Sequence, residues 1–282
     1  MGENIARKSF SNARVAFIVS VYIKDNPMPV LWAIRSMLNQ TYKRVLIFIR
    51  LDGEIKPAVE KLLYLLARKS LNIHISRNTE NCGLAYSLNK LVDFILANHP
   101  EINYFARMDA DDVCFLSRIQ RQVDFLDTHH DIDVLGSACI EFGIYNKVIR
   151  KNTTDKALKR DILKVTPFIH PSVVIRRRVF ESGNRYSLNT QLSEDLAFWL
   201  NLALNGYKFH NIEDVLIYYK LDNQTLCGRI GVKKAISELI ERGNYLFITK
   251  KDIIRNVIYI LGHLIIRLMP LSVIKILYRL LR

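Results

Sequence analysis

Strand and helix signals alternate along the first half of this chain, and the alternation strongly limits the folds it can adopt. Short apolar, β-prone runs are separated by segments of helical length with apolar periodicity. This rhythm predicts an α/β domain built on a parallel sheet with right-handed crossovers. The predicted strands cover residues 15–23, 44–51, 72–76 and 103–108, and the predicted helices cover residues 29–38, 57–69, 84–97 and 116–127.

The second half of the chain is less regular and ends in a basic segment. Strands are predicted at 133–142, 145–150, 171–176 and 214–221, and helices at 155–164 and 193–205. The formal charge is +14, and residues 229–282 carry eleven Lys and Arg against three acids. A basic terminal segment predicts an anionic partner, either nucleic acid or an anionic membrane surface.

Three carboxylates end the fourth predicted strand. Asp109, Asp111 and Asp112 follow an apolar run that closes at Met108. Ligands of open α/β sheets bind outside the carboxyl ends of the strands. Crowded carboxylates repel one another unless a positive group joins them, and oxygen ligands suit Mg²⁺ or Mn²⁺. The alternative is a solvated turn that caps the next helix.

Two further acidic positions have a functional and a structural interpretation. Asp52 ends the second strand, where a carboxylate can accept hydrogen bonds from a base or a ribose. Its alternative is a turn-forming Asp-Gly pair. Glu194 and Asp195 follow Ser193, a predicted N-cap, which places both acids in the first turn of a helix. Their alternative is a simple response to the helix dipole.

A series of short motifs occurs in the order and approximate spacing of one enzyme family. They are Ser20-Val-Tyr22, Ser36-Met-Leu-Asn-Gln-Thr-Tyr42, Leu51-Asp-Gly53, Asn81-Cys-Gly-Leu-Ala85 with Asn89, Arg107-Met-Asp-Ala-Asp-Asp112, His170-Pro-Ser172 and Glu194-Asp195. Together they resemble the family 2 glycosyltransferases. The chain is similar in particular to bacterial enzymes that build O-antigen, capsule and other exopolysaccharides.

The resemblance implies a GT-A fold, which is Rossmann-like, with a mostly parallel sheet flanked by helices and here a C-terminal basic helical extension. It implies a catalytic domain at 14–222, with a nucleotide-sugar-binding half at 14–112 and an acceptor half at 113–222. Residues 223–282 would form the helical tail. The implied activity is inverting transfer of a sugar from a UDP-sugar donor to a lipid-linked glycan acceptor.

The resemblance also implies which residues bind the donor. Ser20, Tyr22 and Asp52 would hold the base and the ribose, with Tyr22 offering a stacking face. Asn81 and Gly83 would lie where the family's glycine-containing loop passes the donor sugar. A glycine there allows close approach of the backbone.

The implied phosphate and metal residues surround the fourth strand end. Arg107 would neutralise phosphate or pair with Asp109. Asp109 would contact ribose or metal, and Asp111 would be the main ligand of Mn²⁺ or Mg²⁺. The family's late metal-binding His has no counterpart in residues 217–222, which leaves the ligand set incomplete.

The implied catalytic base is Asp195, which would take the proton from the attacking acceptor hydroxyl. Glu194 would orient Asp195 or the acceptor. His170 and Trp199 are implied acceptor-binding residues. The structural alternatives are a buried His and a core Trp.

The basic tail predicts a peripheral position on the cytoplasmic face of the cell membrane. Between 252 and 282, the longest stretch without a charged residue is 256–266, which is short of the ~20 apolar residues that a spanning helix needs. Basic and apolar positions beyond Pro270 alternate with helical spacing, as in helices that lie in a bilayer interface. The alternative is an ordinary helix packed on the catalytic domain.

Two other functions compete with sugar transfer. A nucleotidyltransferase would carry a glycine-rich, basic phosphate loop after its first strand, and residues 20–26 contain no glycine. A nucleic-acid-binding protein would interleave basic and aromatic residues on one face. The positive charge here follows an apolar helical tail instead, so no nucleic-acid partner is predicted.

Overall fold

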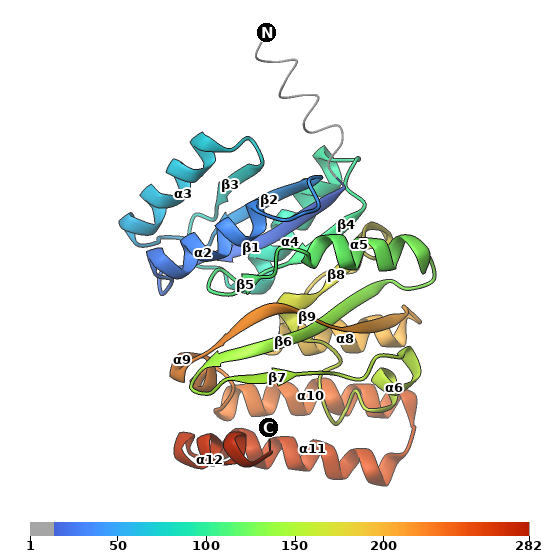
Figure 1. Ribbon diagram of the computed structural model, residues 1–282. Coiled ribbons are helices and arrows are strands. Elements are labelled where there is room, and N and C mark those ends of the chain that lie inside the picture. Colours follow the sequence, from blue (N-terminus) through green and yellow to red (C-terminus); the bar gives the residue numbers. More distant parts are fainter. Residues whose placement is uncertain (1–13, 282) are drawn as a thin grey trace.

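One curled sheet with helices on both faces forms the body of the protein (Figure 1). The computed structural model describes residues 14–281. The strands are β1 (Val15–Val21), β2 (Val45–Leu51), β3 (Ile73–Arg77), β4 (Tyr104–Arg107), β5 (Val113–Cys114), β6 (Val134–Gly143), β7 (Lys147–Ile149), β8 (Val174–Arg176) and β9 (Phe209–Leu221). Their order is β3-β2-β1-β4-β8-β6-β9-β5, with β7 paired to β6.

The first four strands pair in parallel, as the alternation of strands and helices predicts. The later strands join mainly through antiparallel pairs, with β8 between β4 and β6, and β5 beside β9. Several predicted boundaries were wrong, including that of the helix at 155–164, which ends at Arg160. The last strand begins at Phe209 rather than at 214, and Pro171 lies in a short 3-10 turn, η1 (His170–Ser172), before β8. Proline has no N–H to donate to a strand neighbour, which favours the turn.

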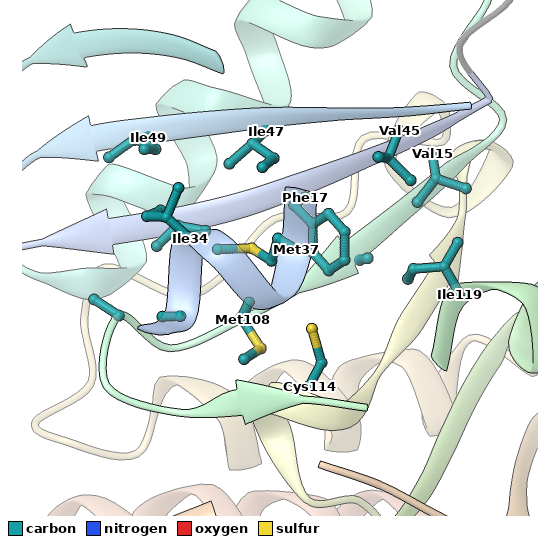
Figure 2. Packing of buried hydrophobic residues seen from close by; sticks show 14 of the residues in the cluster. Val15, Phe17, Ile34, Met37, Val45, Ile47, Ile49, Met108, Cys114 and Ile119 are labelled. Atoms are coloured by element: carbon teal, nitrogen blue, oxygen red, sulfur yellow. The ribbon is translucent and has the colours of Figure 1, made fainter. Parts of the chain in front are cut away.

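The two faces of the sheet are covered by different helices. Helices α2 (Pro27–Leu38), α3 (Pro57–Lys69) and α5 (Arg118–Thr128) pack on the face that includes Phe17 and Ile47. Helix α4 (Leu84–Asn98) packs on the opposite face, which includes Ile18 and Phe48. Alternate residues of a strand point to opposite faces, so both faces of these apolar strands are buried. Figure 2 shows Ile34 of α2 among the buried residues of the first face.

The chain changes direction across the sheet between β1 and β4. It runs from β1 outward to β2 and β3, and α4 then returns it to the other side of β1. Carboxyl ends of strands at such a switch point border a crevice where ligands bind. Ser20, Tyr22, Arg107 and Asp109 lie at this position, so the topology supports a binding site at the predicted edge.

The remaining helices belong to the second half and the tail. They are α6 (Asp155–Arg160), α7 (Arg177–Glu181), α8 (Glu194–Leu204), α9 (Asn223–Cys227), α10 (Val232–Thr249), α11 (Ile253–Leu268) and α12 (Leu271–Leu281). The predicted helical extension is therefore present. Helix α10 packs between α8 and α11, and Leu246 and Ile260 share a buried cluster with Trp199 (Figure 1). Within residues 14–281, no helix combines the length and apolar character required to cross a bilayer.

Candidate active site

Asp52 anchors the glycine-containing loop at the edge of the sheet. Its Oδ1 accepts hydrogen bonds from the Asn78 side-chain amide and the Cys82 N–H, both at 2.8 Å, and its Oδ2 accepts from the Gly83 N–H at 3.0 Å. Gly83 has a φ of 87°, a conformation that favours glycine. Asp52 is 3% exposed, and its carboxylate has a structural role in holding this loop. Its contact with base or ribose stays a prediction.

The Asp52 contacts predict a loss of donor binding when the loop is released. Asp52→Ala leaves the N–H groups of Cys82 and Gly83 without their acceptor, and hydrogen bonds to a charged group contribute about 1.5–3 kcal/mol each. We expect UDP affinity to fall by about tenfold or more, since about 1.4 kcal/mol corresponds to a factor of ten. Titration calorimetry measures it, with Asp52→Asn as the milder control. Equal affinities for wild type and Asp52→Ala would contradict the anchoring role.

Two of the three strand-end carboxylates, those of Asp109 and Asp111, are paired with cations in this structure. Arg107 is buried and forms an ion pair with Asp109. Lys220 of β9 places its Nζ 3.2 Å from an Asp111 carboxylate oxygen and 2.8 Å from an Asp222 oxygen. Each carboxylate of the predicted metal pair therefore has a positive neighbour.

Two further carboxyl groups lie close to this pair. Burial, followed by the charges of Asp109 and Asp111, raises the pKa of Asp112 well above its usual range. Asp112 also accepts a 2.7 Å hydrogen bond from the Lys220 backbone N–H. Burial, followed by the charges of Asp111 and Asp109, raises the pKa of Asp25 to about 7. The site concentrates negative charge, which is the condition under which an added cation is favourable.

Asp109 and Asp111 fit a divalent ion only if the substrate phosphates supply further ligands. Asp109 and Asp111 supply two carboxylates, and Mg²⁺ commonly binds through one or two carboxylates plus substrate phosphates. Across residues 14–281, no group of three or more His, Cys, Asp or Glu side chains could hold a metal ion. The cationic Lys220 stands beside Asp111 and would have to share or yield that carboxylate.

Glu194 and Asp195 open α8, as predicted, but Ser193 does not cap the helix with its side chain. The Ser193 hydroxyl instead lies 2.5 Å from the hydroxyl of Ser237 on α10. Burial, followed by the charge of Asp195, raises the pKa of Glu194.

Helix α10 also holds the residues in front of α8. The Gln191 N–H donates to the Ser237 hydroxyl at 3.1 Å, and the Lys234 ammonium donates to the Leu192 carbonyl. Leu192 has a φ of 56°, which is uncommon for a residue with a branched side chain. Such a conformation persists where its surroundings fix it. The tail helix therefore helps to set the position of Asp195.

His170 and Trp199 occupy different environments. The His170 Nε2 lies 3.2 Å from the Tyr186 hydroxyl, and burial followed by the nearby Arg107 charge holds the pKa of His170 well below its usual range. Trp199 is fully buried, and its ring packs against Phe168. A sugar cannot stack on Trp199 without rearrangement of the core. The burial of Trp199 favours the core alternative, and its contact with the acceptor stays a prediction.

One cavity of about 530 Å³ brings several predicted residues together. Its lining includes Arg107, Asp109, His170, Glu194 and Asp195. Arg107 and Asp109 are far from the acids of α8 in the sequence, so the fold brings the two pairs of residues together. The other predicted donor residues lie outside this lining, as does the metal-site residue Asp111. Ser20, Tyr22 and Gly83 are partly buried, Asp52 is buried and Asn81 is exposed.

Comparison with known proteins assigns the family. The family model described as Glycosyl transferase family 2 matches residues 17–183. The chain belongs to glycosyl transferase family 2. The predicted resemblance is thereby confirmed, and the protein is a glycosyltransferase. Family membership favours sugar transfer over nucleotidyl transfer.

Two bacterial relatives match this family 2 chain along almost its whole length. The UDP-Gal:alpha-D-GlcNAc-diphosphoundecaprenol beta-1,3-galactosyltransferase of Escherichia coli is 30% identical and covers 92% of this chain and 93% of its own. The amylovoran biosynthesis glycosyltransferase AmsE of Erwinia amylovora is 27% identical and covers 93% of this chain and 96% of its own.

A solved mannosyltransferase structure confirms the fold. The mannosyltransferase PcManGT from Pyrobaculum calidifontis, in complex with GDP-Man and Mn²⁺, superposes with a TM-score of 0.64 at 14% identity. The match covers 91% of this chain and 75% of that chain. The likeness shows the GT-A fold with its mostly parallel sheet, as predicted.

Sequence reasoning missed several residues of this family 2 site. Asp25 lies shortly after the first strand, and its carboxylate accepts a 2.8 Å hydrogen bond from the Tyr22 N–H. Lys220 and Asp222 are two positions apart, and this spacing puts them on the same side of extended chain. This two-residue spacing was the sequence feature from which the position of Lys220 could have been predicted. Nothing in the sequence pattern indicated that Ser237 would contact Ser193.

Proposed function

We propose that this glycosyltransferase moves a sugar from a UDP-sugar to a hydroxyl of a lipid-linked glycan, with inversion at the anomeric carbon. One observation carries the proposal. The cavity joins the two carboxylates at the start of α8 to the Arg107–Asp109 pair at the switch point of the sheet. A base beside a phosphate-binding edge is the arrangement that sugar transfer requires.

The proposed reaction is a single displacement. Asp195 accepts the proton of the acceptor hydroxyl while that oxygen bonds to the anomeric carbon from the face opposite the leaving group. The bond from the anomeric carbon to the phosphate oxygen breaks, and UDP leaves with the bonding electrons. Arg107 and Lys220 supply positive charge near the strand end where the diphosphate would lie. Glu194, next to Asp195 at the start of α8, orients the base or the acceptor.

A divalent ion belongs to the proposed donor site. Asp109 and Asp111 would hold Mn²⁺ or Mg²⁺ together with the donor diphosphate. Bound there, the ion would stabilise the negative charge that develops on the leaving diphosphate. The structure of PcManGT in complex with GDP-Man and Mn²⁺ supports this choice of metal class. In the same proposal Ser20, Tyr22 and Asp52 serve the base and ribose, and Asn81 and Gly83 serve the donor sugar.

The substrate classes rest on the E. coli relative. Its name gives UDP-Gal as donor and a GlcNAc-diphosphoundecaprenol as acceptor. We assign the same classes here, a UDP-hexose and a sugar on a lipid diphosphate, in bacterial surface polysaccharide synthesis. The acceptor class would place the protein at the cytoplasmic membrane face. Exposed apolar side chains of the tail, including Phe247 at 78% and Ile254 at 82%, suit such a surface.

Titration of UDP into the full chain tests the donor site. We expect binding in Mn²⁺ that is lost on addition of EDTA, because the proposed ion joins the Asp109 and Asp111 carboxylates to the diphosphate. Asp111→Ala should remove the metal-dependent part of the binding. UDP binding that is unchanged by EDTA and by Asp111→Ala would contradict the metal assignment.

Product analysis tests the reaction itself. The full chain is incubated with a panel of UDP-hexoses and a synthetic GlcNAc-diphospholipid, and the new linkage is read by NMR. Inversion requires the anomeric configuration of the product to be opposite to that of the donor. Retention of configuration, or the absence of product with every donor, would overturn the proposed function.

A further inference from the structure

The cavity at the active site has a second, positively charged part. Apart from the group formed by Arg107, Asp109, Glu194 and Asp195, the charged residues of its lining are six cations and two acids. The cations are Lys151, Lys164, Arg229, Lys234, Arg242 and Arg267, and the acids are Glu141 and Glu238. Four of the six cations come from the tail, so the tail turns this part of the cavity positive.

Three of these tail cations lie close to the Glu238 carboxylate. The Glu238 carboxylate lies 2.9 Å from Arg267, 3.4 Å from Lys234 and 3.6 Å from Arg242. The Arg242 guanidinium also donates to the carbonyls of Ile162 and Leu163 at 3.2 and 2.9 Å. Their contacts hold the tail against the body of the enzyme, and Glu238 compensates much of their charge.

Arg229 is placed differently. Its guanidinium donates to the Tyr219 hydroxyl at 2.8 Å and lies over the Tyr219 ring, 5.6 Å from its centre. An arginine held in one orientation by an aromatic residue suits recognition of a phosphate, because its planar fork matches the phosphate oxygens.

An apolar wall adjoins this charged part. Ile266 of α11 and Ile274 and Leu277 of α12 line the same cavity. The Gly231 N–H donates to the Arg267 carbonyl at 2.8 Å, which puts the segment after Arg229 against the end of α11. Ile265, the neighbour of Ile266, is 57% exposed, so apolar surface continues from the cavity wall to the outside of α11. Figure 1 shows α11 and α12 on the far side of α10 from the sheet.

We infer that Arg229 binds the diphosphate of the acceptor and that Ile266, Ile274 and Leu277 receive the first carbons of its lipid. Carboxylates, cations and apolar side chains line one cavity, and a sugar, a diphosphate and a hydrocarbon follow one another in a lipid-linked acceptor. Lys151 and Lys164 add positive charge to the same lining. The inference rests on the proposed function in one respect, which is that the acceptor hydroxyl reaches Asp195.

Binding of farnesyl diphosphate to the full chain saturated with UDP and Mn²⁺ tests the inference. We expect Arg229→Gln to weaken this binding by about tenfold or more, because a charge-assisted, two-pronged contact is lost, and Arg229→Lys to weaken it less. UDP affinity should not change in either variant. Lys233→Gln is the matched control, since Lys233 is an exposed residue of α10 outside the cavity lining.

Two comparison ligands separate the phosphate from the lipid. Inorganic pyrophosphate should bind more weakly than farnesyl diphosphate, and farnesol should bind more weakly still. Ile266→Asn should weaken farnesyl diphosphate and leave pyrophosphate unchanged. Equal affinity for pyrophosphate and farnesyl diphosphate would overturn the lipid part, and equal affinity of wild type and Arg229→Gln would overturn the diphosphate part.

The same titrations without UDP keep the two proposals apart. Failure to bind UDP would count against the proposed donor site only. Farnesyl diphosphate binding that depends on Arg229 and Ile266 would then still support the acceptor site. A protein that binds UDP but shows no farnesyl diphosphate binding would refute the inference while the proposed function stands.

Discussion

Asp195→Asn is expected to lower kcat by about 10²–10⁴-fold, the range that a positioned general base contributes, and to leave the affinity for UDP unchanged. Asparagine keeps the size of the side chain and can still accept the hydrogen bond that the Leu196 N–H now donates to Asp195 at 2.7 Å. It cannot take a proton from the acceptor hydroxyl. The loss therefore belongs to the chemical step rather than to folding or donor binding.

The control for this variant lies next to it. Glu194→Gln replaces the neighbouring carboxyl group with an amide of similar size that still forms hydrogen bonds, so we expect a smaller loss of kcat. Single-turnover transfer and UDP calorimetry on both variants separate the two roles. Equal losses in the two variants would show that Asp195 is not the sole base, and a parallel loss of UDP affinity would point to a structural defect.

Glu238→Gln is expected to lower the free energy of unfolding by about 3–5 kcal/mol, the usual effect of removing one partner from a buried ion pair. The Glu238 side chain is 5% exposed and lies within 4 Å of Lys234, Arg242 and Arg267. Glutamine preserves its shape but leaves these cations without their counter-charge. Because Lys234 also holds the Leu192 carbonyl, the transfer rate should fall together with the stability.

Urea unfolding measures this effect against an exposed pair of the same tail. Asp252 is 57% exposed and pairs with Arg255 at 2.5 Å, and such surface pairs contribute about 0–1 kcal/mol. Asp252 has a φ of 46°, a conformation that asparagine tolerates, so Asp252→Asn is a suitable control. A similar loss of stability in both variants would show that Glu238 does not organise the tail.

The sequence was sufficient for the elements whose signals are local. The strands around β1, β2 and β4 are continuous apolar runs, and Pro57 begins α3 as its sequence position suggests. The strand-end carboxylates could be placed because every parallel strand of such a sheet presents its carboxyl end to the same edge. The sequence pattern was enough for these elements because each depends mainly on residues that are neighbours in the chain.

The missed features depend on contacts between distant parts of the chain. The Lys220–Asp111 pair joins residues 109 positions apart, and the Ser193–Ser237 contact joins residues 44 positions apart. The raised pKa of Asp25 comes from burial and then from carboxylates that only the fold brings near. Trp199 was assigned both a core and a sugar-stacking interpretation because a single sequence does not show which side of α8 faces the cavity.

The contacts between α10 and residues 191–193 have a consequence for the construction of chimaeric transferases. If the tail of a relative replaced the tail of this enzyme, the Ser237–Ser193 and Lys234–Leu192 contacts would be lost unless the new tail carried matching residues. Acceptor specificity is therefore expected to travel with the acceptor half and the tail exchanged as one block. A crossover placed after residue 112 keeps those contacts intact, whereas one placed after residue 222 cuts through them.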